Sequence, residues 1–234
     1  MTARDPARAE ITRQGLSVGV ATGLYGISFG ALAADGGLDL AQICVLSLVM
    51  FSGGSQFALV GVLSAGGGTG PAVAGAGLLG LRNGLYAVQL SPLLAAGARR
   101  VPLAAQLTID ESTAVALGAQ ARHPDRPQLW RRGFWVTGAS VYVCWNAATV
   151  LGALAGARLA DPRTAGLDGA AAAAFLALVW PRVDTPAARL AAGVAVLAAV
   201  ALVPLTPAGV PVLGAAVLAT AAGVLHDRRQ GPTT

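Results

Sequence analysis

Residues 40–63 read LAQICVLSLVMFSGGSQFALVGVL, a run of 24 residues without a charged side chain. A helix that spans a bilayer needs roughly 20 mainly apolar residues, so this run predicts a transmembrane helix. The flanking sequence has the same character, because the only charged residues between Gly15 and Gly97 are Asp35, Asp39 and Arg82. This part of the chain therefore has room for three spanning helices.

The composition of the whole chain agrees with a membrane location. Of its 234 residues, 55% are hydrophobic and 12% are charged, whereas a soluble domain carries about 25% charged residues. The apolar runs are long and rich in Ala, Gly and Leu, unlike the short alternating strands of a membrane barrel. We expect an all-α polytopic bundle that forms one transmembrane transport domain over residues 1–234, multi-pass in the inner (plasma) membrane.

The apolar runs predict seven spans. They lie at about 15–34, 40–63, 70–98, 133–157, 165–181, 187–204 and 207–225.

The arginine-rich segment 99–132 leaves the number of spans open. Thr108 followed by Glu111 resembles a capping box, which predicts a helix that runs to about Ala121. If 103–121 spans, eight helices put both chain ends inside, with 11 arginines inside and 4 outside. If it does not span, seven helices put the N-terminus outside, with 10 inside and 5 outside. Basic residues prefer the cytoplasmic side, so both arrangements predict a cytoplasmic C-terminus.

A short motif occurs twice. Gly37-Leu38-Asp39-Leu40-Ala41 and Gly166-Leu167-Asp168-Gly169-Ala170 each lead into an apolar run. Transporters are commonly built from internal repeats with interrupted helices, so we predict repeat halves at 15–98 and 133–204. Chance similarity in a chain rich in Ala and Gly is the alternative.

A polar string interrupts the second predicted span. It consists of Ser52, Gly53, Gly54, Ser55 and Gln56. Each glycine weakens a helix by about 1 kcal/mol relative to Ala, and irregular backbone at membrane depth is tolerated only inside protein or beside a water-filled cavity. We interpret the string as substrate-binding, with close helix packing through small residues as the alternative.

Arg82 and Asn83 lie within the third predicted span. An arginine at mid-span is costly and normally faces the bundle interior with a partner. Asp110, Glu111 or a substrate carboxylate could be that partner, and a purely structural ion pair is the alternative. Counting residues from the glycine-rich turn at 66–68, Gln56 and Arg82 differ in depth by about 6 Å, so we predict that both touch one substrate.

The acids Asp110, Glu111 and Asp168 are candidates for proton coupling or ion pairing. An ordinary helix N-terminus, which favours acidic residues, explains them equally well. We find no metal-ligand spacing, nucleotide-binding loop or catalytic set, and we therefore expect no enzyme activity, metal or cofactor. The arginines lie in short loops and tails, as topology requires, and we expect no nucleic-acid partner.

Four motifs in order resemble the AzlC family, the large subunit of branched-chain amino acid exporters. The first is G-x-x-F-G-A-L-A at 26–33 with S-L-V-M-F-S-G-G-S-Q-F at 47–57. The others are L-R-N-G-L-Y at 81–86, D-E-S at 110–112, and the segment from Gly166 to Pro181. Ser55 departs from the pattern, which has a small apolar residue at this position.

This resemblance implies a secondary exporter of leucine, isoleucine, valine and other neutral apolar amino acids. It also implies a small AzlD-type membrane partner subunit. Two alternatives remain: a structural or permease subunit of a larger complex of the ABC type, and an intramembrane enzyme.

Overall fold

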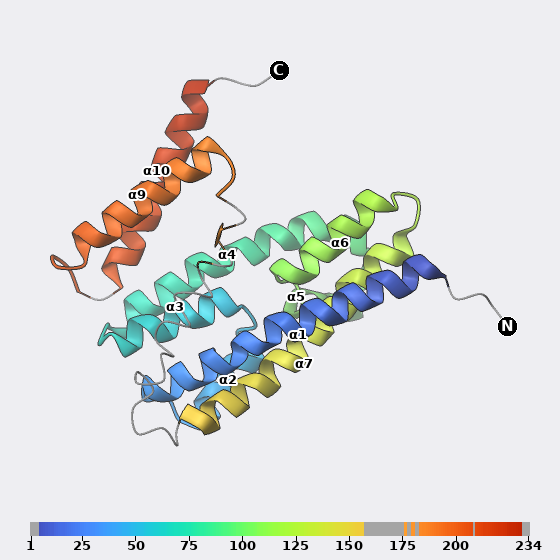
Figure 1. Cartoon of the computed structure of the whole chain (residues 1–234), viewed down its shortest axis with the longest axis horizontal. Helices are drawn as coiled ribbons and strands as arrows, with labels where there is room; N and C mark the ends of the chain where they lie inside the picture. Colours follow the sequence, from blue (N-terminus) through green and yellow to red (C-terminus); the bar gives the residue numbers. More distant parts are fainter. Residues whose placement is uncertain (1–4, 157–175, 177–178, 181–182, 208, 231–234) are drawn as a thin grey trace.

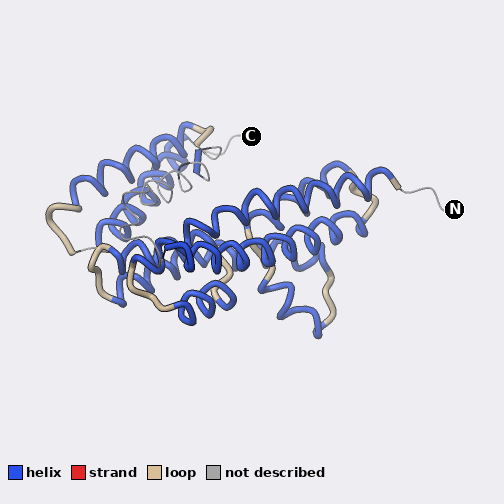
Figure 2. Tube along the Cα trace, turned by 60° about the horizontal axis from the view of Figure 1, so that its bottom comes forward, coloured by secondary structure: helices blue, strands red, loops and turns tan. Residues whose placement is uncertain are grey.

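The computed structural model describes residues 5–156, 176, 179–180, 183–207 and 209–230, and every regular element within them is helical (Figures 1 and 2). The expected all-α fold is thereby confirmed for the described residues. Most of the predicted span 165–181, with Asp168 and the second copy of the repeated motif, lies outside them. The helices are α1 (Pro6–Asp35), α2 (Leu40–Val49), α3 (Gly53–Ser64), α4 (Thr69–Leu94), η1 (Ala98–Arg100), α5 (Val101–Gln106), α6 (Asp110–Arg122), α7 (Pro127–Gly156), α9 (Pro186–Leu202) and α10 (Val210–Gln230).

Helices α1 and α7 pack side by side in parallel and form the most extensive helix–helix contact among the described residues (Figure 1). Their axes approach closely because glycines face the neighbouring helix. A Cβ on Gly30 would lie 2.0 Å from the Thr149 carbonyl oxygen, and one on Gly152 would lie 2.0 Å from that of Ile27. Such small-residue contacts are typical of helices that pack within membranes.

Among the described residues, α1 and α7 are the two helices that are long and apolar enough to cross a membrane. Each has 30 residues, which corresponds to about 45 Å. The predicted total of seven to eight spans is therefore not confirmed.

The predicted span 40–63 is instead a helical hairpin of two half-length helices. Helix α2 ends at Val49, residues 50–52 form a turn, and α3 begins at Gly53. The end of α3 lies beside the end of α1, since a Cβ on Gly36 would lie 2.5 Å from Ser64 Oγ. The chain thus enters the bundle and returns to the same end.

A second hairpin enters from the opposite end. Helices α5 and α6 join through a turn at 107–109. Arg122, at the end of α6, donates to Gln14 Oε1 of α1 (3.1 Å), and Arg131 donates to the Leu93 carbonyl at the end of α4 (3.3 Å). Segment 103–121 therefore does not span as one helix, and α6 begins at Asp110 rather than being capped by Thr108.

Helix α4 runs from one end of the bundle to the other as a continuous helix of 26 residues, past Arg82. Its C-terminal end lies with the N-terminal ends of α1 and α7. There Arg126 pairs with Asp5, and this hydrogen bond lowers the pKa of the Asp5 carboxyl.

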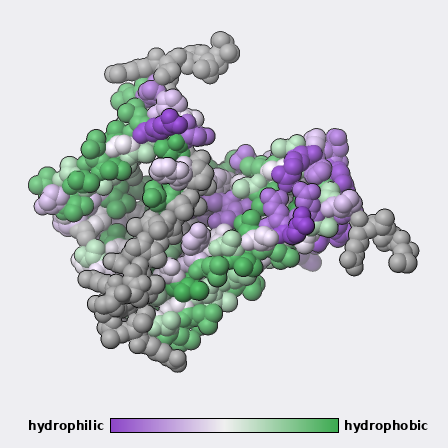
Figure 3. All heavy atoms as spheres, in the orientation of Figure 1, coloured by the Kyte–Doolittle hydropathy of each residue, from purple (hydrophilic) through white to green (hydrophobic). Residues whose placement is uncertain are grey.

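Arginine is distributed unequally between the two ends. Between residues 5 and 156, every arginine except Arg82 lies at the end that contains the start of α1, where Figure 3 shows a hydrophilic surface. The loops at the opposite end, 36–39 and 65–68, contain no basic residue. Of the two arrangements that the sequence left open, the seven-helix one separates the N-terminus from segment 99–132, whereas in the structure both lie at one end.

Helices α9 and α10 form a separate antiparallel pair (Figure 1). The turn between them packs on the ends of α3 and α4, since a Cβ on Gly209 would lie 2.9 Å from Val62 and 2.7 Å from Pro71 side-chain atoms. The two hairpins and the junction between them belong to the first 156 residues.

Candidate functional site

The turns of the two hairpins meet near the middle of the bundle. Gln106, the last residue of α5, donates from Nε2 to the Leu48 carbonyl of α2 at 2.8 Å. The hydroxyl of Tyr142, from α7, donates to the same carbonyl at 3.2 Å. Side chains from two neighbouring segments thus satisfy a carbonyl in the last turn of α2, where intrahelical partners run out.

Gln56 stabilises the turn of the first hairpin, at residues 50–52. Its side chain is fully buried (0% exposed), and its Nε2 donates to the Met50 carbonyl at 2.7 Å. Its Oε1 accepts a hydrogen bond from Trp145 Nε1 of α7 at 2.9 Å. Because irregular backbone at membrane depth needs such internal partners, Gln56 is a structural clasp between the hairpin and α7.

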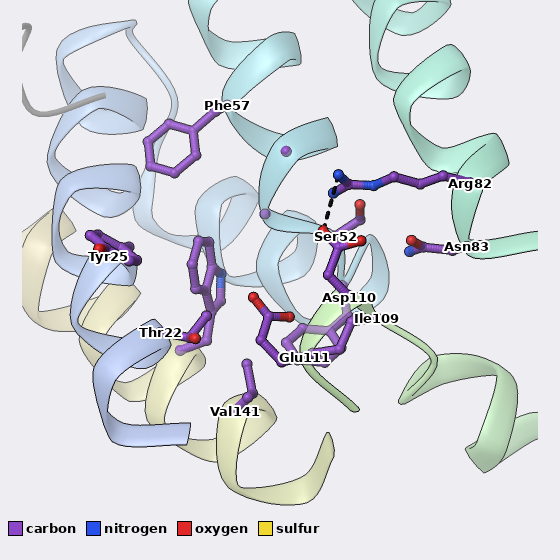
Figure 4. A pocket seen from close by; sticks show the side chains of 14 residues that line it. Thr22, Tyr25, Ser52, Phe57, Arg82, Asn83, Ile109, Asp110, Glu111 and Val141 are labelled. Atoms are coloured by element: carbon purple, nitrogen blue, oxygen red, sulfur yellow. Dashed lines mark ion pairs between the residues drawn. The ribbon is translucent and has the colours of Figure 1, made fainter. Parts of the chain in front are cut away.

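A cavity of about 190 Å³ lies beside the two turns. Figure 4 shows Arg82 and Asp110 on one side of it, Thr22 and Tyr25 on the other, and Glu111 projecting into the space between them. Its lining comes from α1, α3, α4, α6, α7 and the two turns, and comprises Thr22, Tyr25, Phe51, Ser52, Gly53, Gly54, Phe57, Arg82, Asn83, Ile109, Asp110, Glu111, Val141 and Trp145.

The N-terminal ends of α3 and α6 both open onto this cavity. In α3 the first intrahelical hydrogen bond runs from Gln56 N to the Ser52 carbonyl (2.9 Å). The N–H groups of Gly53 and Gly54 therefore have no acceptor within the helix, and Ser52 gives no side-chain cap. Exposed N–H groups and the helix dipole favour an anionic group at such a position.

The glycines at the start of α3 permit close approach by larger side chains. A Cβ on Gly53 would lie 2.9 Å from the indole of Trp145, and one on Gly54 would lie 3.0 Å from Arg82 Nη2. The guanidinium group can therefore lie directly against the first turn of α3. Two sources of positive potential meet there, the helix end and Arg82.

An ion pair joins α4 to α6 across the cavity wall. Arg82 Nη1 lies 3.0 Å from Asp110 Oδ2, with side-chain exposures of 28% and 7%. Of the candidate partners that the sequence left open, Asp110 is the acid that pairs with Arg82 in the structure. Within the described residues, Arg82 Nε and Asn83 Oδ1 are buried without a hydrogen-bond partner, so this wall contains a donor and an acceptor whose hydrogen bonds are not satisfied in the structure.

The remaining wall is aromatic and apolar. The Phe57 and Trp145 rings lie edge-to-face with centroids 6.2 Å apart, and Phe29 stacks behind Trp145 at the same distance. Val141 and Phe51 extend this wall. The cavity thus combines a charged side with an apolar side.

A family model described as AzlC protein matches residues 17–159, which is more than half of the chain. The chain belongs to the AzlC family. This family is associated with branched-chain amino acid transport, and with the two long apolar helices it identifies the chain as a membrane protein. Neither a curated protein nor a solved structure matches.

The cavity of this AzlC protein brings together most of the residues that the sequence suggested. Ser55 and Gln56 do not line it, because both side chains are buried in the packing of the hairpin. Gln56 therefore does not face Arg82 as predicted. Seven of the ten predicted site residues do line it: Ser52, Gly53, Gly54, Arg82, Asn83, Asp110 and Glu111.

The sequence did not identify the apolar wall of the cavity in this AzlC protein. Thr22, Tyr25 and Val141 lie in long apolar runs, where nothing distinguishes a cavity-lining residue from a lipid-facing one. Trp145 was the available signal, because a Trp with its N–H at mid-span needs a buried acceptor.

Proposed function

We propose that this AzlC protein exports branched-chain and other neutral apolar amino acids through the cavity at the junction of its two hairpins. The observation that carries the proposal is the pairing of Arg82 and the uncapped α3 N-terminus with an aromatic wall. A free amino acid needs a cationic partner for its carboxylate, an acceptor for its ammonium group and an apolar site for its side chain.

Each of these needs has a matching group. The substrate carboxylate lies at the N–H groups of Gly53 and Gly54, beside Arg82, as at the half-helix ends of other transporters. Glu111 and Asp110 accept the ammonium group, and they also carry the coupling proton of a secondary exporter. Trp145 and the residues around it contact the aliphatic side chain.

We also propose a small AzlD-type partner subunit. Within residues 5–156 the described chain has three long helices, α1, α4 and α7, and two hairpins that each return to their own end. A pathway through such a small bundle needs further walls, and a partner subunit supplies them.

The test is export of labelled leucine from cells that lack their own exporter. We expect the chain together with the AzlD-type subunit to lower cell leucine and to confer resistance to toxic leucine analogues, and the chain alone to do so weakly. Full resistance from the chain alone would refute the need for a partner subunit. Absence of any leucine efflux with both subunits would refute the exporter function.

We propose that the arginine-rich end faces the cytoplasm, since basic residues are retained on that side. The N-terminus then lies on the cytoplasmic side of the plasma membrane, and we place the C-terminus on the same side. A reporter that is active only in the cytoplasm should be active when fused before Met1 and after Thr234. Activity only of a periplasmic or extracellular reporter at either position would overturn that placement.

A further inference from the structure

A second cavity lies behind the first. It measures about 440 Å³ and is lined by the end of α2, α3, α4 as far as Asn83, the end of α5 and residues of the two hairpin turns. Its apolar lining includes Val49, Leu59, Val73 and Ala76, and no residue of its lining is charged. It is therefore suited to an aliphatic side chain and not to a carboxylate.

The two cavities share a wall. Phe51, Ser52 and Asn83 line both of them. Ser52 Oγ lies 3.1 Å from Ser55 Oγ, and Asn83 Oδ1 is buried without a hydrogen-bond partner in the described part of the chain. One layer of side chains, from the turn at residues 50–52 and from α4, thus separates the charged cavity from the apolar one.

Charged side chains distinguish the two cavities. Arg82, Asp110 and Glu111 line the first cavity, whereas the second has no charged residue in its lining. The start of α3 borders both, because Ser52 lines both and Ser55 lines the second. An amino acid between the two cavities therefore has its charged groups drawn to the first and its aliphatic side chain drawn to the second.

The second cavity is displaced toward the arginine-poor end of the bundle. Gly77 and Ala76 of its lining precede Arg82 in α4 by five and six residues, which places them about 8–9 Å nearer the start of that helix. The start of α4 lies at the end opposite the arginines of residues 5–156, Arg82 excepted.

We propose that the second cavity is a transient binding site for the same neutral apolar amino acid, on the external side of the wall made by Ser52 and Asn83. The inference rests on the proposed exporter function. The substrate leaves the first cavity when this wall separates, and it passes through the second before release.

Gly77→Leu tests this site. A Cβ on Gly77 meets no atom within 4 Å, so a leucine side chain can extend into the second cavity without disturbing the packing. We expect the variant to bind labelled leucine as the wild type does, because the first cavity is intact, while its leucine efflux falls to the background rate.

Gly84→Leu is the matched control. Gly84 lies on the same helix, has equally open space around it and lines neither cavity. Efflux by this control should equal that of the wild type. If Gly77→Leu exports as well as Gly84→Leu, the second site is refuted while the exporter function stands. If the wild type binds and exports no leucine, the proposed function fails, and this inference fails with it.

A cysteine variant keeps the test independent of any folding defect in Gly77→Leu. Gly77→Cys is made in a protein that carries Cys44→Ser and Cys144→Ser, and intact cells are treated with a membrane-impermeant thiol reagent. We expect labelling from outside and a consequent loss of efflux. Labelling only in inverted vesicles would overturn the inference.

Discussion

Arg82→Gln should abolish leucine export. The guanidinium group lies against the first turn of α3 and pairs with Asp110 at 3.0 Å, so its loss removes the cation that binds the substrate carboxylate. Hydrogen bonds to charged groups contribute about 1.5–3 kcal/mol, which corresponds to a roughly 10- to 150-fold loss of affinity. Leucine efflux from cells and leucine binding to purified protein are the two measurements.

A double variant separates this role from a structural one. The single change leaves the Asp110 carboxylate, which is 7% exposed, without its cation, and breaking a buried ion pair costs about 3–5 kcal/mol. Arg82→Gln with Asp110→Asn replaces the pair by neutral amides and should restore protein level and thermal stability, but not leucine binding. Restoration of leucine binding and export by the double variant would show that Arg82 has a structural role only.

Gln56→Leu should destabilise the folded protein strongly. The change removes the acceptor of the Trp145 indole N–H and a donor to the Met50 carbonyl, inside a hairpin where Gln56 has no exposed surface. The Met50 carbonyl keeps the Ser52 backbone N–H as a donor at 2.7 Å, so the Trp145 indole N–H is the buried group left without a partner. Such a group costs about 1–3 kcal/mol, a sizeable part of the 5–15 kcal/mol that is typical of a folded protein.

The matched control for this variant is Gln89→Leu. Gln89 lies on the exposed surface of α4, and the same substitution there orphans no buried group. We expect Gln89→Leu to accumulate and melt like the wild type, and Gln56→Leu to accumulate poorly or melt at a much lower temperature. A Gln56→Leu protein that is stable but does not bind leucine would instead identify Gln56 as a substrate contact.

The long helices could be predicted from the sequence because their apolar runs have no competing explanation. The hairpins could not. Two half-length apolar helices in succession have the same composition as one full span, so residues 40–63 satisfy the length criterion whether the chain crosses or turns back. Only the polar string beginning at Ser52 indicates an interruption, and it does not reveal the direction of the chain after it.

The charged side of the cavity was predictable because charge at membrane depth is costly and demands a partner. That argument paired Arg82 with an acid, and the structure selects Asp110. It failed for Gln56, because polarity alone does not distinguish a side chain that faces a cavity from one that binds backbone. In the turn at residues 50–52 the Met50 carbonyl accepts a hydrogen bond from Gln56, so the Gln56 side chain binds backbone and does not face the cavity.

The most direct test of the account is whether substrate protects the cavity from chemical modification. Ser52→Cys is made in the background of Cys44→Ser and Cys144→Ser, since Ser52 lines the cavity and a cysteine has nearly the same size. We predict that leucine, isoleucine and valine slow alkylation of this cysteine, while glutamate does not, and that a cysteine at Gly84 is alkylated at one rate with or without leucine. Equal alkylation of Ser52→Cys with and without saturating leucine, in a protein that still exports leucine, would contradict the proposed site.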